Sequence, residues 1–265
     1  MIYVATSHWK VARWIDIQLY YFRNFIPGCK IYLSATKDVV KHHGGKFDFA
    51  GNVRREELPM PFDLYKKRDH GSLDHSMRLN GLFDLIEKDA KPCDVVIFVD
   101  ADAFPVAPIS AWLLRNVKHR GMVSICEFDE DRPNASFCAT TVDLFKRFGA
   151  DWSPGYYSML IPPLKCRSSA FDTGGCIAIK MNSAECYWVK LRRSNKRNIH
   201  PTLFGVYGNK VYHNGAGLRK KKKTTPEVVL SNDGVYRINI KRNKYLLKRV
   251  FDWIQSDRNF YRSLR

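Results

Sequence analysis

Residues 94–100 constrain the fold more than any other part of this sequence. Five apolar residues, 95–99, stand between two aspartates, and most of the five are β-branched. An apolar run that is this short and this rich in β-branched residues predicts a strand buried on both faces, which is the environment of strands in a parallel sheet. The segment therefore favours a parallel sheet at the core of the molecule.

Strand and helix patterns alternate along the rest of the chain. Short apolar runs predict strands, and apolar residues that recur every three or four positions predict amphipathic helices. The expected strands are residues 2–5, 30–35, 95–99, 121–126, 176–181 and 211–213. The expected helices are residues 11–26, 72–86, 142–148 and 182–193, with loops over residues 46–61 and 151–163. This order predicts an α/β fold with a mixed, mostly parallel sheet flanked by helices.

The composition is that of an ordinary globular protein. Of the 265 residues, 45% are hydrophobic and 26% are charged, which excludes a disordered chain, a coiled coil and a fibrous repeat. No uncharged apolar run approaches the roughly 18 residues that span a bilayer, and residues 1–10 lack the features of a secretory signal. The seven cysteines form no CxxC motif and no zinc-type spacing. We therefore expect a reduced, cytoplasmic protein.

Positive charge is concentrated near the end of the sequence. The formal net charge is +18, and residues 219–265 contribute +10 of it, from 14 basic and 4 acidic side chains. A strongly basic chain predicts an anionic partner, such as a nucleotide, a nucleic acid or an anionic membrane. The shift in composition places a domain boundary near residues 217–220, which gives a domain of residues 1–218 and a basic C-terminal extension of residues 219–265.

The basic extension is expected to contain a strand over residues 235–240 and a helix over residues 245–264. The apolar residues of this helix fall near one face, and its basic residues lie elsewhere. One interpretation is a helix packed on the core with a solvated basic face. The other is peripheral contact with an anionic membrane.

The residues that follow the predicted strand 95–99 give the strongest chemical signal. Asp100 and Asp102 point the same way in extended backbone, and the small Ala101 between them lets another group approach. Ligands of open α/β sheets bind beyond the carboxyl ends of strands, where this pair lies. Carboxylate oxygens suit a hard cation such as Mg²⁺ or Mn²⁺, shared with substrate phosphates. The alternative is a polar turn after a strand.

Segments on either side of this pair offer groups that bind anions. Residues 69–80 predict a helix start with Ser, His and Arg donors, which suits a bound anion. The alternative is a capped helix whose Arg78 makes a surface ion pair. Residues 211–219 offer His213 as a further metal ligand and Arg219 within reach of a phosphate, although a lone histidine is more often structural.

Asp172 is a further candidate for a ligand-binding residue, at the entrance of a predicted strand. It stands in the sequence FDTGG, before the strand predicted at residues 176–181. The glycine pair permits unusual backbone angles and the close approach of a ligand. The alternative is an ordinary β-turn.

Together these segments resemble the GT-A glycosyltransferases, which use nucleotide-sugar donors. The resemblance covers roughly residues 1–219 and rests on DVVIFVDADAFP, GSLDHSMRLNGL, FDTGG and YHNGAGLR. It implies the Rossmann-like GT-A fold, and a divalent metal that Asp100 and Asp102 hold against the donor diphosphate. It also implies that Thr6 and Ser7, with His8 beside them, cradle the nucleoside.

The closing segment is similar to the HxxGxxK segment of glycogenin-like retaining enzymes but departs from it. Ala216 stands at the glycine position, glycines stand at 215 and 217, and Arg219 replaces the lysine. The resemblance therefore supports His213 as a metal ligand more than it supports retention of configuration.

These residues define an expected reaction. Breaking an anomeric C–O bond leaves a nucleoside diphosphate with extra negative charge, which a cation held by Asp100, Asp102 and His213 would stabilise. Asp172 is the first candidate for the base that an inverting mechanism needs, followed by Asp151 and Glu127. In a retaining mechanism the departing phosphate could take the proton, and Asp172 would only orient the sugar. The residues expected to bind the donor are Thr6, Ser7, Arg78, Asn80, Asp100, Ala101, Asp102 and Arg219.

Two other functions stay open beside a UDP- or GDP-sugar transferase with a glycan or lipid-linked acceptor. A nucleic-acid-binding protein would suit the net charge of +18 and the 13% aromatic content. The aromatic residues, however, are spread through predicted core runs and form no stacking platform, so we expect no nucleic-acid partner. A sugar-nucleotide pyrophosphorylase would need a glycine-rich basic loop after the first strand, and residues 6–13 contain no glycine.

Overall fold

A seven-stranded sheet organises the molecule. The computed structural model describes residues 1–8, 12–56, 70–127, 132–149, 151–161, 166–183, 187–200, 203–215, 227–231, 234–238 and 240–265. The sheet has the order β10-β6-β7-β4-β1-β2-β3. Its strands are β1 (Ile2–His8), β2 (Lys30–Ala35), β3 (Phe49–Gly51), β4 (Val95–Asp100), β6 (Met122–Ile125), β7 (Asn134–Thr141) and β10 (Val189–Leu191). Only the two pairs that β7 makes are antiparallel, and the other four are parallel. The expected mixed, mostly parallel sheet is confirmed.

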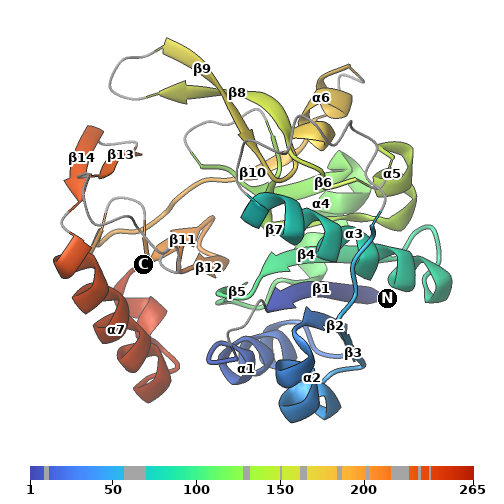
Figure 1. Cartoon of the computed structure of the whole chain (residues 1–265), viewed down its shortest axis with the longest axis horizontal. Helices are drawn as coiled ribbons and strands as arrows, with labels where there is room; N and C mark the ends of the chain where they lie inside the picture. Colours follow the sequence, from blue (N-terminus) through green and yellow to red (C-terminus); the bar gives the residue numbers. More distant parts are fainter. Residues whose placement is uncertain are drawn as a thin grey trace.

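Helices cover both faces of this sheet (Figure 1). They are α1 (Ile15–Phe25), α2 (Lys37–His43), α3 (His70–Asp89), α4 (Ser110–Arg120), α5 (Val142–Arg147), α6 (Gly175–Ser183) and α7 (Ile240–Ser256). Strand residues alternate between two apolar cores. Val4 and Ile97 lie in the core that receives α1, α4 and α7, whereas Ala5 and Phe98 lie in the core that receives α3, α5 and α6. β4 is therefore buried on both faces, as its sequence predicts.

A small antiparallel sheet stands beyond the end of β4. It has the order β11-β12-β5, with β11 at Gly205–Tyr207, β12 at Val211–His213 and β5 at Ala103–Pro105. In the register of β12 and β5, His213 lies opposite Ala103. Because Asp102 directly precedes Ala103, this pairing brings His213 beside the aspartates that follow β4.

Two predicted loops contain strands. Residues 49–51 form β3, which pairs with β2 at the edge of the main sheet. Within residues 151–163, β8 (Gly155–Ile161) pairs with β9 (Cys166–Asp172). The glycine and tyrosine content of residues 151–163 suggested a binding loop, but adjacent tyrosines are equally favourable in strands. The two predictions of loop were wrong over these strands.

The predictions for residues 176–181 and 182–193 were also wrong. Residues 176–181 lie in the helix α6, and residues 189–191 form the strand β10. A short apolar run does not distinguish a strand from a buried helix. The burial of the side chains follows the helical period. Ile177 and Met181, four residues apart, are buried, whereas Ile179 between them is 52% exposed. In a strand, all three would share one face.

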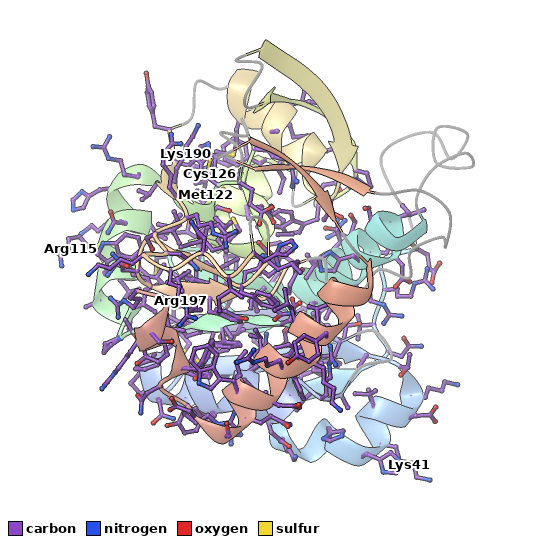
Figure 2. All side chains as sticks on the ribbon, turned by 90° about the vertical axis from the view of Figure 1, so that its left-hand side faces the viewer. Lys41, Arg115, Met122, Cys126, Lys190 and Arg197 are labelled. Atoms are coloured by element: carbon purple, nitrogen blue, oxygen red, sulfur yellow. The ribbon has the colours of Figure 1, made fainter. Side chains whose placement is uncertain are left out.

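The C-terminal helix α7 packs against the core that also contains α1. Figure 2 turns α7 toward the viewer. Val250 and Ile254 are buried, and the ring of Phe251 meets Trp14 edge to face at 4.9 Å. A short 3-10 helix, Phe260–Ser263, follows and buries Phe260. The strands β13 (Glu227–Ser231) and β14 (Gly234–Ile238) form a hairpin before α7. The boundary near residue 218 stays a prediction, because residues 216–226 lie outside the described residues.

Candidate metal and nucleotide site

Gln18 of α1 holds the turn that carries both aspartates. Its amide nitrogen donates to the backbone carbonyls of Asp100 at 2.8 Å and Ala103 at 2.9 Å. Its amide oxygen accepts from Thr6 Oγ1 at 3.0 Å and contacts His8 Nε2 at 2.9 Å. Because an amide oxygen only accepts, His8 donates from Nε2. This buried network fixes the backbone between β4 and β5.

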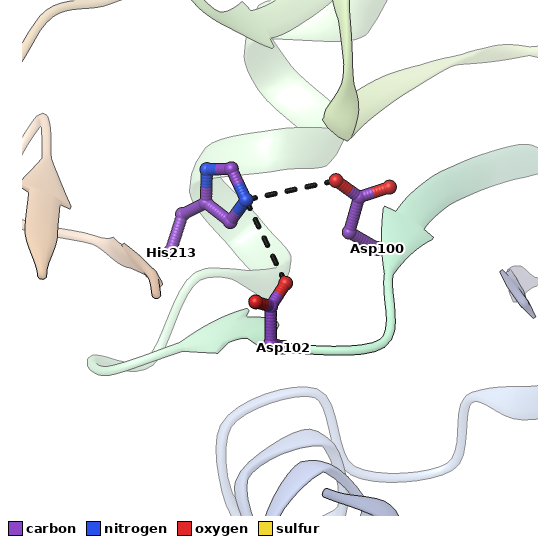
Figure 3. Close-up of side chains that lie close together, drawn as sticks. All are labelled: Asp100, Asp102 and His213. Atoms are coloured by element: carbon purple, nitrogen blue, oxygen red, sulfur yellow. Dashed lines mark ion pairs between the residues drawn. The ribbon is translucent and has the colours of Figure 1, made fainter. Parts of the chain in front are cut away.

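Asp100, Asp102 and His213 bring three ligand atoms together (Figure 3). Nε2 of His213 lies 3.6 Å from Oδ2 of Asp100 and 3.6 Å from Oδ1 of Asp102. One ligand atom from each residue lies within 4.8 Å of the other two. Asp102 and His213 are buried and Asp100 is partly exposed, so the cluster meets solvent through Asp100.

Burial and mutual charge set the protonation of the cluster. Burial, opposed in part by the charge of His213, raises the pKa of Asp102 to about 6. Burial alone would lower the pKa of His213, but the negative charges of Glu127, Asp102 and Asp100 outweigh it and raise the pKa to about 9. The imidazolium thus offsets part of the negative charge of the carboxylates around it, and a cation that binds through Nε2 must displace the proton there.

The three side chains fit a divalent cation. Carboxylate oxygens suit Mg²⁺ and Mn²⁺, and an imidazole nitrogen is a common further ligand of a transition metal. Ligands of an octahedral ion at about 2.1 Å lie roughly 3 Å apart when adjacent and roughly 4.2 Å apart when opposite. The distances from His213 Nε2 to the two carboxylate oxygens, both 3.6 Å, fall between these values, and the three ligand atoms all lie within 4.8 Å of one another. Three protein ligands would leave positions for phosphate oxygens or water.

Comparisons with known proteins give likeness in structure only. No family model and no curated protein sequence matches the chain. The galactosyltransferase LgtC, solved in complex with donor and acceptor sugar analogues, aligns at 14% identity and a TM-score of 0.37, over 56% of this chain and 60% of LgtC. A protein assigned as a nucleotide-diphospho-sugar transferase, from Desulfovibrio desulfuricans G20, aligns at 12% identity and a TM-score of 0.40, over 72% of this chain and 79% of that protein. With both TM-scores below 0.5, we build the functional proposal on the geometry of the site.

The first strand brings Ser7 to the same edge of the sheet. In the register of the three strands, Ser7 of β1 lies between Ser34 of β2 and Asp100 of β4. Thr6 points to the other face, where it is fully buried and bonds Gln18. Thr6 therefore supports the turn that carries the aspartates. The predicted contacts of Thr6 and Ser7 with a donor stay predictions.

Arg78 and Asn80 join α3 to neighbouring segments. Arg78 is 1% exposed, and its guanidinium donates to Asp74 Oδ2 at 2.8 Å and to Ser34 Oγ at 3.1 Å. It is a buried cation and not a surface ion pair. Asn80 donates to Asp151 Oδ1 at 3.0 Å, and its own side-chain oxygen accepts from the backbone of residue 152. Their predicted roles in donor binding are untested.

The candidate bases lie in different surroundings. Glu127 belongs to the cluster, with Oε1 3.6 Å from Nδ1 of His213. Asp151 is buried, and its Oδ1 accepts from Asn80 and from the backbone of Ser153. The backbone of Asp172 ends β9 opposite Gly155, but its side chain is outside the described part of the structure. Arg219 also lies outside the described residues.

Two further residues of the site were not singled out by the sequence. His75 of α3 places Nε2 3.1 Å from Oδ1 of Asp100, on the side of the carboxylate away from His213. Its position inside the segment GSLDHSMRLNGL was the available signal. Gln18 stands three residues after Ile15 and four before Phe22, so it is a polar residue on an apolar helix face. A buried polar side chain of this kind must bond something specific.

Proposed function

We propose that this protein is a metal-dependent glycosyltransferase that takes a sugar from a nucleoside-diphosphate donor. The observation that carries the proposal is the convergence of Asp100, Asp102 and His213 at the carboxyl end of a central strand. The spacing of their ligand atoms and the open side of the cluster suit a cation shared with a diphosphate. UDP- and GDP-sugars are the donors we consider, with Mn²⁺ or Mg²⁺ as the cofactor.

In this proposal, the residues of the chain bind the cation and orient the donor and the acceptor. Asp100, Asp102 and His213 would hold the cation, which, when bound, neutralises the charge of the leaving diphosphate. Ser7, at the same edge of the sheet, would contact the donor, and Arg219 is the proposed second cation on the phosphates. Asp172 would orient the acceptor hydroxyl, or take its proton if configuration inverts. A glycan or a lipid-linked sugar is the proposed acceptor, and membrane contact through residues 219–265 is a further proposal.

A thermal-shift panel tests the metal-dependent donor site. UDP and GDP should raise the melting temperature of the protein in the presence of Mn²⁺ or Mg²⁺ and leave it unchanged in EDTA. Asp102→Asn should abolish the shift, because it removes a charged ligand without changing the volume of the side chain. Asp143→Asn is a matched control, since Asp143 is an exposed aspartate paired with Arg147. Equal stabilisation by nucleotide in EDTA would contradict the proposal.

A further inference from the structure

Glu127 lies beside His213, on the side of the imidazole ring opposite to Asp100 and Asp102. It follows the strand β6, and its Oε1 accepts a hydrogen bond from Tyr207 Oη at 2.9 Å. The same oxygen lies 3.6 Å from Nδ1 of His213, while Nε2 of that ring faces Asp100 and Asp102. Nδ1 is buried, and no described residue gives it a hydrogen bond of standard length.

The small sheet explains why Tyr207 and His213 meet the same carboxylate. β11 and β12 are antiparallel, with Tyr207 opposite Val211 and His213 opposite Gly205. Residues 211 and 213 point to the same face of their strand, so Tyr207 and His213 are diagonal neighbours on one face. Glu127 reaches this face from the main sheet. Tyr207 therefore holds the Glu127 carboxylate by a hydrogen bond, close to Nδ1 of His213.

We infer that Glu127 is a positioning residue that orients His213 for metal binding and keeps the proton of the neutral ring on Nδ1. The inference rests on the metal site proposed above. An imidazole that binds a cation through Nε2 must carry its proton on Nδ1, and a carboxylate that accepts from Nδ1 selects this tautomer and fixes the plane of the ring. This role differs from that of a base acting on the acceptor, because Glu127 then acts through His213.

Manganese binding to the full chain tests the inference without an activity assay. Free Mn²⁺ is measured by electron paramagnetic resonance during titration of the wild type, Glu127→Gln, Tyr207→Phe and Glu87→Gln. Loss of an outer carboxylate partner typically lowers metal affinity about 10–100-fold, which is the effect expected for Glu127→Gln. Tyr207→Phe should have a smaller effect, since it leaves the carboxylate in place. Glu87→Gln should bind as the wild type does, because Glu87 pairs with Lys146 outside the site.

A spectroscopic signature separates positioning from general loss of structure. Pulsed measurements on bound Mn²⁺ detect the coupling to a ligating ¹⁴N nucleus. The wild type should show one such coupling that His213→Ala removes and Glu127→Gln weakens, with the circular dichroism spectrum unchanged. If Glu127→Gln does not fold, ¹⁵N shifts of His213 in the metal-free wild-type protein, at a pH at which the ring is neutral, report the tautomer that the protein itself selects, and a proton on Nε2 overturns the inference.

The outcomes distinguish this inference from the function on which it rests. Tight Mn²⁺ binding by the wild type, with an unchanged affinity and an unchanged ¹⁴N coupling in Glu127→Gln, removes the role of Glu127 and leaves the metal site standing. Absence of Mn²⁺ binding by the wild type removes the metal site itself, and the role of Glu127 with it.

Discussion

At the scale of single residues, the turn that carries Asp100 and Asp102 is held by Gln18, which is not one of the three proposed metal ligands. Gln18 uses both ends of its amide, donating to two backbone carbonyls of the turn and accepting from β1. These carbonyls belong to the last residue of β4 and the first residue of β5, so Gln18 joins the two ends of the turn. The positions of Asp100 and Asp102 are thus set from α1.

Replacing Gln18 by methionine keeps the volume of the side chain and removes its donors. Two carbonyls would lose their hydrogen bonds, so we expect Gln18→Met to lower the free energy of unfolding by about 2–3 kcal/mol. Urea denaturation measures the change. Asn24→Met is the matched control on the same helix, where the exposed amide donates to the carbonyl of Tyr20, and it should change stability by less than about 0.5 kcal/mol. Equal effects of the two substitutions would refute the role assigned to Gln18.

The catalytic assignment of Asp172 yields a second prediction at this scale. Asp172→Asn should preserve metal-dependent nucleotide binding and reduce glycosyl transfer by about 10²-fold or more, the usual scale for a general base. A change confined to turnover indicates an interaction made in the transition state. Donor binding is followed by thermal shift, and transfer by release of the nucleoside diphosphate, starting from donor hydrolysis. Near-normal turnover would contradict the proposed role of Asp172 and make Asp151 the next candidate base.

The sequence predicted part of this site for a definite physical reason. Asp100 and His213 end strands, Asp102 lies two residues beyond the end of β4, and the ends of strands in α/β folds are where ligand-binding side chains gather. Sequence spacing could not show that Gln18 of α1 bonds Thr6, or that Arg78 is buried against Asp74. Those facts depend on tertiary packing.

At the scale of elements, the clearest difference between prediction and structure lies around α6. β2 and β4 were predictable because charged residues, with Pro27 and Gly28 before β2, bound their apolar runs, whereas the prediction for β1 stopped before the polar Thr6, three residues short of the end of the strand. Residues 176–181 are also preceded by glycines, but nearly every residue of the run is apolar, so neither the helical nor the strand period emerges. Their helical state depends on Gly174, whose φ is +83°, and on the close approach of Gly175 to Gly155. Neither feature can be read from the pattern of apolar residues.

The contact between Gly175 and Gly155 gives a prediction for this element. A Cβ at residue 175 would collide with the backbone carbonyl of Gly155, where no side chain can move aside. We therefore expect Gly175→Ala to lower the free energy of unfolding by about 1–3 kcal/mol, the usual cost of overpacking. Gly45→Ala is the control, because a Cβ there meets no atom within 4 Å and its φ is not positive. Its stability should stay within about 0.5 kcal/mol of the wild type.

At the scale of the whole molecule, the boundary that the net charge suggests near residue 219 does not coincide with a boundary in the packing of the core. Residues 219–265 are distinct by their net charge of +10, yet Val250, Ile254 and Phe260 are buried in the same core as Val4 and Ile97. Basic side chains also lie outside this extension, as Arg115, Lys190 and Arg197 show in Figure 2. Among the described residues, no helix combines the length and the apolar character needed to cross a membrane. The positive charge is therefore a property of the surface of residues 219–265, whereas the buried apolar residues of α7 determine how the helix packs on the core.

The shared core predicts that α7 and the central sheet unfold together. Ile254 is fully buried, and Ile254→Ala should lower the free energy of unfolding by about 2–5 kcal/mol, through lost burial and the cavity left behind. If α7 belongs to the cooperative unit, the variant shows one thermal transition at a lower temperature, and hydrogen exchange accelerates in β4 as much as in α7. Gln255→Ala, at the exposed neighbouring position, should leave both measurements unchanged. Accelerated exchange confined to α7, with β4 as protected as in the wild type, would instead make the helix a separately unfolding appendage, because local opening leaves the amides of the remaining core protected.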